Sequence, residues 1–590
     1  MKKEDLDLFE IQKEIDSLPQ GGISYKNING KRYAYYQWRE NGKQHSRRAK
    51  DQELESLTYK IEKRKELQQL LKEESFEYSA APRSVEPRHI PKFNCVMRTG
   101  NRLKEYIKRV HGWNVRSNFY SLKDYIYSES TDRLFILYGL KNTGKTTLMS
   151  QVMAHMSDDM LKRTAYILVQ EKQTFKELNE DMEQLEAQGY KYIFIDQITL
   201  LEGFQESLGV LADIYVASGM KVVLTGGDSL SFAFAKNSHL SNKAIFCHTT
   251  YLSYGEYVET MNIKGIDGYL EHGGIMSNYL DEVYMTFFNE KSAAEYVNLS
   301  LGKNIERSIG ESNLGGADSG GADLGVDLNG NLSETVSSVL DHMNCIFLRD
   351  VLSDNFHGNS LKFSQEQKEG QVNIEKVNKI LKELVEIKLL KEQAMYLDDF
   401  ERDQIEEYLR LLDVSADLET RYMSDYNKRT LRAAITQPGL RYVHVKTLVE
   451  RLMEDEIFRE LDLSERKSVT DAILEEVKRA LLKDTVMLDT MAKNPKASVF
   501  SLQFVSGKFD MVLADFKKGN CEIFQISRAM EPLDPSEIEI ERAENCQETE
   551  FRYGKILGKY VIYMGPTKMI DGISYINIEE FLCKKIAANF

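Results

Sequence analysis

The sequence predicts an α/β protein whose central unit is a parallel β-sheet with crossover helices. The first observation is an alternation of short apolar runs with segments of helical periodicity, as successive β–α–β units require. The second is a glycine-rich turn, residues 139–147, that follows one apolar run and opens a helix. The third is an aspartate that ends another apolar run about fifty residues later. Together these observations predict a ligand at the carboxyl ends of the strands.

Length and composition limit the classes of protein to consider. With 590 residues and 42% hydrophobic content the chain can bury several cores, and we expect about four domains. The net charge of −15 argues against indiscriminate binding to nucleic acid or anionic lipid. No run approaches ~18 apolar residues, so neither a signal peptide nor a membrane span is expected. The 6 scattered cysteines indicate neither zinc nor disulfides and favour a cytoplasmic protein.

Shifts in composition divide the chain into consecutive segments. They are an N-terminal helix (1–20), a basic β-meander plus helix (21–75), a linker (76–117), a parallel α/β core (118–262), a helical region (263–360), a winged-helix-like and helical region (361–495), and a smaller α/β domain (496–590). The glycine-rich acidic stretch 310–333 is expected to be a disordered insertion. A calcium loop is the alternative for this stretch, but it lacks the terminal glutamate of a helix–loop–helix site.

Residues 21–50 form a basic and aromatic segment inside this acidic chain. Eight Lys and Arg residues stand against the single acid Glu40, a local net charge of +7 (8 − 1). Two Asn-Gly dipeptides separate three strand-like runs and predict a meander with type I′ hairpins. Aromatic residues are interleaved with the cations, so the meander either contacts DNA or uses its aromatics for its own small core.

Apolar runs in the core predict its strands, and the stretches between them predict its helices. The expected strands are 134–138, 165–169, 192–195, 221–224 and 244–247, and the expected helices are 145–157, 174–187 and 204–218. Four further strands are expected near the C-terminus, at 499–505, 509–514, 522–526 and 559–563, whereas residues 401–492 are expected to be helical.

The segment GLKNTGKTT, from Gly139 to Thr147, has the composition of a phosphate-binding loop. Successive backbone N–H groups of a glycine-rich turn at a helix start can wrap a phosphate, although an ordinary strand-to-helix turn is the alternative. Lys145 can reach the β and γ phosphates, and Thr146 is placed to ligate Mg²⁺. The residues expected to bind the nucleotide are Gly139, Asn142, Thr143, Gly144, Lys145, Thr146 and Thr147. The sequence therefore predicts a P-loop NTPase that binds ATP and Mg²⁺.

The catalytic side of this site departs from the usual pattern. Asp196 ends an apolar run, where a carboxylate holds Mg²⁺ through water. The next residue is Gln197, where ATPases of the additional-strand class usually carry a glutamate. An amide can orient water but cannot accept a proton at pH 7, and Glu202 is the nearest later acid that could replace it. Thr225 follows the next run and is expected to sense the γ-phosphate, with ordinary turn chemistry as the alternative.

The motifs LYGLKNTGKTTLM, YIFIDQITLLEGF and HTTYLSYGEY resemble those of prokaryotic AAA-type ATPases of the archaeal-type ATPase group. In that group the C-terminal half carries a restriction-nuclease-like domain of unknown function. The resemblance runs from about residue 118 to the end and is more specific in the ATPase half. It implies an ATP-driven switch or remodeller, with a protein partner or self-association as further expectations.

The chain departs from this family pattern at several positions. Lys243 stands where a basic residue, usually arginine, follows the sensor segment, so it can supply charge but not a planar fork. In the nuclease-like domain Asp510 supplies the first acid, but Gln525 and Ser527 occupy the places of the expected Glu and Lys. Glu522 is expected to point to the opposite side of its strand from Gln525. The domain is therefore expected to be catalytically silent.

The leading hypothesis from the sequence is an ATP-binding, Mg²⁺-dependent switch with slow or absent hydrolysis. One alternative is an active ATPase that uses Glu202 or a partner's residue and remodels or regulates DNA or a protein partner. A second is a DNA-associated binding module that acts through residues 21–50. A third is a Mg²⁺-dependent nuclease.

Overall fold

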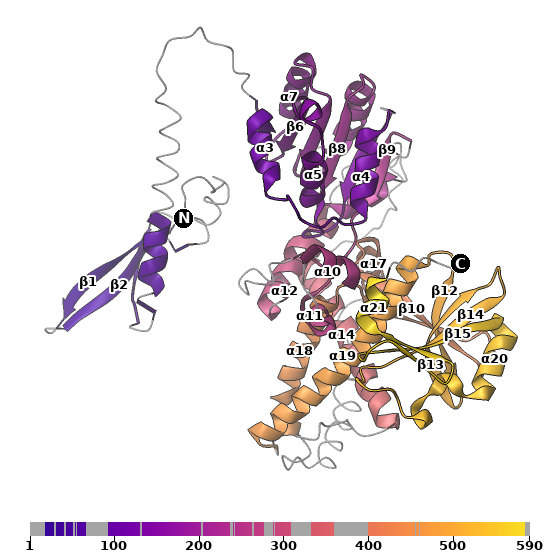
Figure 1. Ribbon diagram of the computed structural model, residues 1–590. Helices are drawn as coiled ribbons and strands as arrows, with labels where there is room; N and C mark the ends of the chain where they lie inside the picture. The colour runs from indigo at the N-terminus through magenta and orange to yellow at the C-terminus, as the bar shows by residue number, and fades with distance from the viewer. Residues whose placement is uncertain are drawn as a thin grey trace, which may run out of the picture. The chain divides into compact units, whose positions relative to one another are not determined.

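A computed structural model shows two compact units, Met1–Pro91 and Lys92–Phe590, each of which is described by itself (Figure 1). The structure describes residues 18–19, 21–28, 31–40, 43–50, 53–54, 56–65, 93–129, 132–201, 204–236, 240, 242–261, 265–276, 287, 289–307, 332–358, 399–454, 456–459 and 461–584. The expected N-terminal helix, the insertion up to residue 331 and the winged-helix-like stretch 359–398 lie outside these residues.

The first unit contains the predicted antiparallel meander. Its strands are β1 (Gly22–Ile28), β2 (Lys31–Glu40) and β3 (Lys43–Arg48), in the order β1-β2-β3, and helical residues follow between 53 and 65. Ile28 pairs with Lys31 and Glu40 with Lys43, the register of two-residue hairpin connections. Ala34, Ala49 and Ile61 are buried, so this unit has a small core. The meander prediction is confirmed.

The second unit begins with a six-stranded sheet in the order β4-β6-β7-β8-β5-β9. Its parallel strands are β5 (Leu134–Tyr138), β6 (Thr164–Leu168), β7 (Tyr192–Asp196), β8 (Lys221–Gly226) and β9 (Ala244–His248). They confirm the predicted strands, whereas β4 (Val96–Thr99), which pairs antiparallel with β6, was not predicted. Because β8 lies between β5 and β7, the strand before the phosphate loop and the strand that ends in Asp196 are not neighbours.

Helices cover both faces of this sheet. They are α3 (Gly100–Lys108), α4 (Asn118–Tyr127), α5 (Lys145–Ala154), α6 (Asp158–Leu161), α7 (Phe175–Ala187), α8 (Phe204–Val210) and α9 (Ser229–Lys236), and the π-helical turn η2 (Leu211–Val216) continues α8. Helix α10 (Tyr254–Met261) follows the last strand, and its buried Tyr254 and Tyr257 belong to a different core. Along β5, Phe135 and Leu137 pack with α3, α4 and α5, while Leu134 and Ile136 pack with α7 and α8. Burial on both faces explains why these strands are continuous apolar runs.

The rest of the second unit joins a helical region to an eight-stranded sheet in the order β11-β10-β12-β13-β14-β15-β17-β16. The helices are α11 (Ile266–His272), α12 (Glu290–Tyr296) with the π-helical turn η4 (Val297–Gly302), α14 (Leu332–Gly358), α17 (Asp399–Leu411), α18 (Pro438–Met453), α19 (Leu463–Lys493), α20 (Ala543–Tyr553) and α21 (Ile578–Cys583). The strands are β10 (Ser415–Tyr422), β11 (Arg429–Ile435), β12 (Ser498–Phe504), β13 (Gly507–Asp515), β14 (Asn520–Ile526), β15 (Lys555–Tyr563), β16 (Lys568–Ile570) and β17 (Ile573–Asn577).

The hairpin of β10 and β11 corrects the expectation that residues 401–492 are helical. β10 runs parallel to β12, with Thr420 opposite Ser501, so this sheet begins before the predicted boundary at residue 496. The prediction failed because the hairpin is flanked by helices on both sides and carries many polar residues. Pairing with β12 overrides its weak local pattern.

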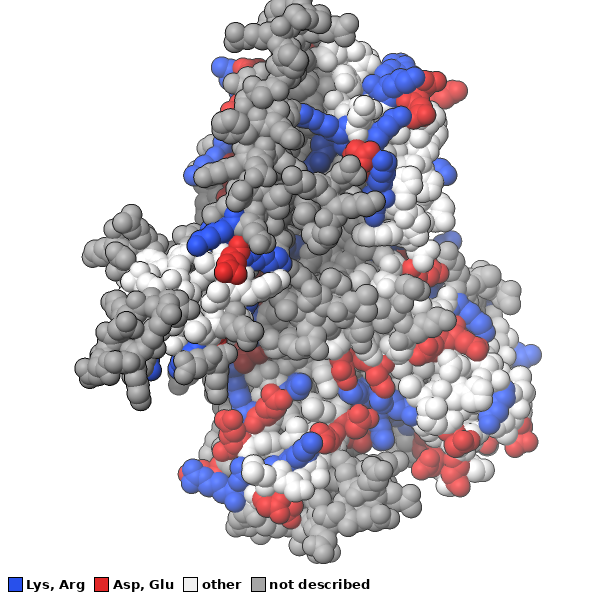
Figure 2. Space-filling model, turned by 60° about the vertical axis from the view of Figure 1, so that its left-hand side comes forward, with Lys and Arg blue, Asp and Glu red and all other residues white. Residues whose placement is uncertain are grey.

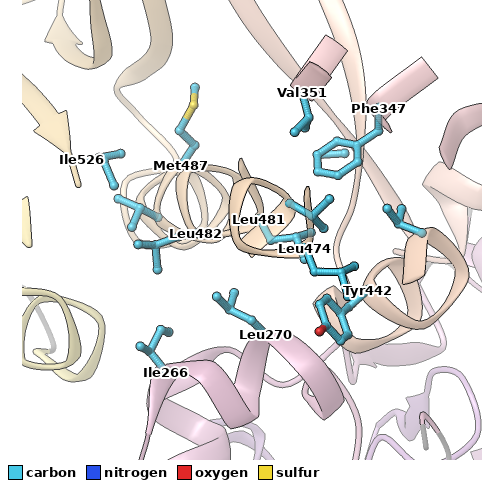
Figure 3. Close-up of a cluster of buried hydrophobic side chains, with 14 of the residues drawn as sticks. Ile266, Leu270, Phe347, Val351, Tyr442, Leu474, Leu481, Leu482, Met487 and Ile526 are labelled. Carbon is cyan, nitrogen blue, oxygen red and sulfur yellow. The ribbon is translucent and has the colours of Figure 1, made fainter. Parts of the chain in front are cut away.

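Helix α19, 31 residues long, is the centre of the largest core. In Figure 3 Leu474, Leu481, Leu482 and Met487 of α19 lie among side chains from four other elements. These side chains are Ile266 and Leu270 of α11, Phe347 and Val351 of α14, Tyr442 of α18 and Ile526 of β14. Helices that follow the ATPase core and the C-terminal sheet therefore share one hydrophobic core.

The described surface carries both signs of charge. On the face in Figure 2, Lys and Arg side chains lie interspersed with Asp and Glu side chains rather than gathered by sign. Among the helices that the structure describes, none combines the length and the hydropathy needed to cross a bilayer.

We predict that Leu481→Ala lowers the free energy of unfolding by about 2–5 kcal/mol, because it removes a fully buried side chain at the centre of the shared core. Leu463→Ala is the matched control, since Leu463 lies on the same helix and is 85% exposed, and it should change stability by less than about 0.5 kcal/mol. Thermal and denaturant unfolding measure both. Equal midpoints for the two variants would contradict the central role of α19.

Candidate nucleotide-binding site

The loop that follows β5 has a backbone that only glycines permit at two positions. Gly139 and Gly144 have φ values of 154° and 87°. A Cβ at Gly139 would lie 2.2 Å from the carbonyl oxygen of Thr249, and a Cβ at Gly144 would lie 2.7 Å from Sδ of Met276. Asn142 is also left-handed, with φ of 64°, a conformation that asparagine tolerates better than most residues. The loop is therefore tightly surrounded on its outer side.

Lys145 begins α5 and lies against the loop from which it projects. Its Nζ donates to the carbonyl oxygens of Gly139 and Leu140, both at 2.7 Å. Burial lowers the pKa of Lys145 to about 8, and the nearby Arg116 cation acts in the same direction, while Asp196 opposes both. The ammonium group thus stands beside the loop, where it can exchange carbonyl partners for phosphate oxygens.

Asp196 ends β7, and its carboxylate accepts hydrogen bonds from hydroxyl groups on three other elements. Its Oδ2 accepts from Thr146 at 2.7 Å and from the Tyr166 hydroxyl at 2.8 Å, and its Oδ1 accepts from Thr225. The carboxylate is 2% exposed, and burial raises the pKa of the Tyr166 hydroxyl, which therefore stays a donor. The structure thus brings together Thr146, Asp196 and Thr225, as the sequence predicted for the carboxyl edge of the sheet.

Two predicted threonines make contacts inside the protein. Thr225 is completely buried, and its hydroxyl also accepts from the backbone N–H of Gln197 at 3.3 Å. Thr143 is buried too, and its hydroxyl donates to Leu140 O at 2.8 Å and lies 2.9 Å from the Thr249 hydroxyl. A phosphate would therefore meet the backbone of Thr143 rather than its side chain. The sensor role of Thr225 stays a prediction.

Gln197 is exposed and has left-handed backbone, with φ of 60°. A glutamine in this region is uncommon, and such conformations persist where the surrounding structure imposes them. Here the bond from its N–H to Thr225 fixes the turn that follows β7. Its side chain thus stands at the solvent-facing edge of the site. Glu202, the alternative general base, lies outside the described residues.

Lys243 does not join this site in its own chain. It immediately precedes β9, and its carbonyl oxygen accepts from the N–H of Leu134, the first residue of β5. The phosphate loop follows the other end of β5, roughly 16 Å away for a five-residue strand. The Lys243 ammonium group instead pairs with Asp213 at 2.7 Å. Lys243 therefore does not contact the phosphate loop of its own chain, and its catalytic role stays a prediction.

Several residues at the site were missed by sequence reasoning. Tyr166 bonds Asp196, the His248 ring stacks on Tyr138 at 4.6 Å, and Arg116 reaches the phosphate loop. Burial and the nearby cations, Lys145 among them, lower the pKa of His248 to about 4, so its ring is neutral. The only signal for His248 in the sequence is its place at the start of the motif HTTYLSYGEY, which carries part of the family resemblance.

Comparison with known proteins identifies the domain that holds this site. Residues 131–258 match the family described as AAA domain. No curated protein matches the chain. Among solved structures, the S. cerevisiae Hsp104–ADP complex matches with a TM-score of 0.24 and 12% sequence identity, over 67% of this chain and 62% of that chain. This chain thus covers less than two thirds of that chain's length. The family match and the strand order show an AAA-type P-loop domain of the nucleotide-binding class.

We predict that nucleotide affinity falls as pH rises through about 8, because the free protein then loses the Lys145 proton that a triphosphate needs. Between pH 7 and pH 9 the dissociation constant of an ATP analogue should rise about tenfold. Fluorescence titration in matched ionic strength measures it. In Lys145→Arg the cation stays charged, so this pH dependence should disappear; an unchanged pH dependence would assign it to another group.

Proposed function

We propose that this AAA-type protein is an ATP-binding, Mg²⁺-dependent switch that hydrolyses ATP slowly or not at all. The observation that carries the proposal is the exposed Gln197 directly after Asp196, at the position expected for a general base. The loop before it has the glycines, lysine and threonine of a phosphate cradle. Binding is thus well supported by the residues, whereas proton abstraction from water is not.

The residues at the loop fit a magnesium ion. Thr146 and Asp196 supply hydroxyl and carboxylate oxygens that lie 2.7 Å apart, and hard divalent cations prefer such oxygen ligands. When bound, Mg²⁺ would offset phosphate charge. In the structure three hydroxyl groups donate to the Asp196 carboxylate. Thr146 can turn its hydroxyl from the carboxylate and present an oxygen lone pair.

Gln197 limits what the chain can do with a bound nucleotide. Its amide can donate to or accept from a water molecule and so hold it near the γ-phosphate. It cannot remove the proton that the attacking water must lose. ATP would therefore remain bound long enough for its presence to change how the parts of the protein dock.

We predict that Gln197→Glu raises the ATP turnover of the purified protein by at least about tenfold, because general bases contribute about 10²–10⁴-fold in enzymes. Phosphate release under saturating Mg²⁺ and ATP measures it. Gln188→Glu is the control. Gln188 is exposed at the end of α7, so this substitution adds the same negative charge away from the site.

Turnover by the wild-type protein tests the slow-switch proposal directly. Hydrolysis faster than ~1 s⁻¹ would reject it, because working enzymes turn over at such rates. If the wild-type protein is slow and Gln197→Glu gives no gain, the favoured alternative becomes an ATPase that depends on a residue from a partner.

We further propose that the C-terminal sheet does not cleave nucleic acid. Asp510 and Lys483 line a groove of about 1060 Å³ in this part of the chain. The two oxygens of Asp510 accept from Lys483 Nζ at 2.7 Å and from the N–H of Ile526 at 2.8 Å. Although burial alone would raise the pKa of Asp510, Lys483 and Lys508 hold it below its usual value. The negative charge of Asp510 is thus already compensated by these neighbouring groups of the protein.

The neighbours of Asp510 do not complete a metal site. The Gln525 amide donates to Glu537 O at 2.7 Å and accepts from the N–H of Glu539 at 3.0 Å. Glu522 accepts from the Tyr560 hydroxyl at 3.2 Å. Among the residues that the structure describes, no three His, Cys, Asp or Glu side chains are grouped to hold a metal ion. These residues therefore do not fit the Mg²⁺ that nuclease chemistry requires.

A second candidate function is DNA contact by the N-terminal meander. Tyr36, Trp38 and His45 form a stacked column, with ring centroids 5.0 Å and 5.4 Å apart in successive pairs. The Arg47 guanidinium lies 5.6 Å from the Tyr36 ring and also pairs with Glu53. His45 and Arg47 are exposed. Stacked rings beside cations suit contact with bases and phosphates, in a segment whose sequence carries a net charge of +7 (8 − 1).

We predict that Trp38→Ala weakens binding of the full chain to a DNA oligonucleotide at low salt by about tenfold, because stacking of one base contributes about 1–3 kcal/mol. Fluorescence anisotropy over a salt series measures it. Tyr59→Ala removes an exposed aromatic side chain of the same unit outside the column and should bind as the wild type does. No binding by the wild-type protein in low salt would end this candidate.

A further inference from the structure

The guanidinium group of Arg116 forms hydrogen bonds through all three of its nitrogen atoms beside the phosphate loop. The residue lies two positions before α4 and is 3% exposed. Nη1 donates to Thr143 O at 2.7 Å and to Thr250 O at 3.2 Å, and Nη2 donates to Tyr251 O at 3.2 Å. Nε and Nη2 also donate to Glu256, at 3.2 Å and 2.6 Å. These five bonds match the five N–H groups that a guanidinium carries.

Glu256 fixes the plane of this guanidinium. Its Oε2 receives both bonds from Arg116, and its Oε1 accepts from the N–H and hydroxyl of Ser117 at 3.3 Å and 3.0 Å. Burial would raise the pKa of Glu256, but Arg116 and Ser117 together hold it below its usual value. Both partners of this buried ion pair are therefore charged and tightly held.

The bond from Arg116 to the loop determines where a backbone N–H points. The carbonyl of Thr143 and the N–H of Gly144 belong to one planar trans peptide, so they point in opposite directions. Because Arg116 holds the carbonyl outward, it aims the Gly144 N–H toward the inner side of the loop, where a phosphate binds. The N–H of Met276 does the same for the preceding peptide by donating to Asn142 O at 2.8 Å.

The two contacts on the outer side of the loop, from Arg116 and from Met276, are both connected to the C-terminal half of the second unit. The N–H of Tyr251, whose carbonyl faces Arg116, donates to Asp413 at 3.0 Å. Asp413 lies between α17 and β10, and its own carbonyl accepts from the Thr436 hydroxyl at 2.5 Å.

The segment that carries Met276 makes a second connection. Gly273 accepts from the N–H of Gly439 at 3.2 Å, and a Cβ at Gly274 would lie 2.7 Å from Cα of Gln437. The two routes therefore lead from adjacent peptides of the phosphate loop to the start of α18 and the hairpin before it.

We propose that Arg116 is a positioning residue that aims the Gly144 N–H at the bound phosphate, and that its link through Tyr251 to Asp413 makes nucleotide affinity depend on the docking of residues 411–441. The proposal rests on nucleotide binding at this loop. Linkage is reciprocal, so a nucleotide that holds the loop peptides also stabilises the docked C-terminal half.

Asp413 allows a test outside the nucleotide site. Asp413→Gly removes the acceptor for Tyr251 and suits the left-handed backbone at this position, where φ is 61°. We expect it to weaken the binding of an ATP analogue by about fivefold or more. Asp413→Asn keeps an acceptor oxygen and should bind as the wild type does. Asp571→Gly is the matched control, because Asp571 also has positive φ, of 47°, and lies in the turn between β16 and β17.

Hydrogen exchange on the full chain distinguishes coupling from a merely structural role. In the wild-type protein, the ATP analogue should slow amide exchange in residues 411–441. Arg116→Lys keeps a cation but not the planar fork, and it should lose this nucleotide-dependent protection. Equal affinities for Asp413→Gly and the wild type, or no response in 411–441, would overturn the proposal. No analogue uptake by the wild type would overturn nucleotide binding as well, whereas rapid hydrolysis would reject only the slow switch.

Discussion

The carboxylate of Asp196 holds the ligand-binding edge of the ATPase sheet together. Hydroxyl groups of Thr146, Tyr166 and Thr225 reach it from α5, β6 and β8, so one buried anion connects the phosphate-loop helix to the two strands that flank β7. A buried charge is tolerated only when such donors compensate it. Because these hydroxyl donors are neutral, they do not cancel the negative charge of Asp196. That charge can therefore attract a divalent cation.

Local pattern was sufficient to predict the phosphate loop, the parallel strands and the proximity of Thr146 to Asp196. Each follows from apolar runs and from the rule that parallel strands end at one edge of a sheet. Arg116 could not be found in this way, because its partners lie 27 to 140 residues away in the chain and meet only after packing. The place of Lys243 could not be found either, since its position after the expected sensor segment does not reveal that it lies at the end of β5 opposite the phosphate loop.

Two buried aspartates in this chain have different surroundings, and the difference bears on their chemistry. Asp196 is compensated by hydroxyl groups, which can rotate and also coordinate a cation. Asp510 is compensated by the Lys483 ammonium group and a backbone N–H, and neither can act as a ligand. The first arrangement suits an ion that comes and goes with a nucleotide. The second suits a structural carboxylate.

The core around α19 contains side chains from Leu252, shortly after the last strand of the ATPase sheet, to Leu582 near the end of the described chain. An AAA-type segment excised at residue 262 would leave the apolar faces of α10 and the preceding turn exposed to water. Recombination that transplants this ATPase into another protein would have to carry α11, α18 and α19 with it. The compact unit is therefore the whole of residues 92–590 rather than the shorter segment that the family match covers.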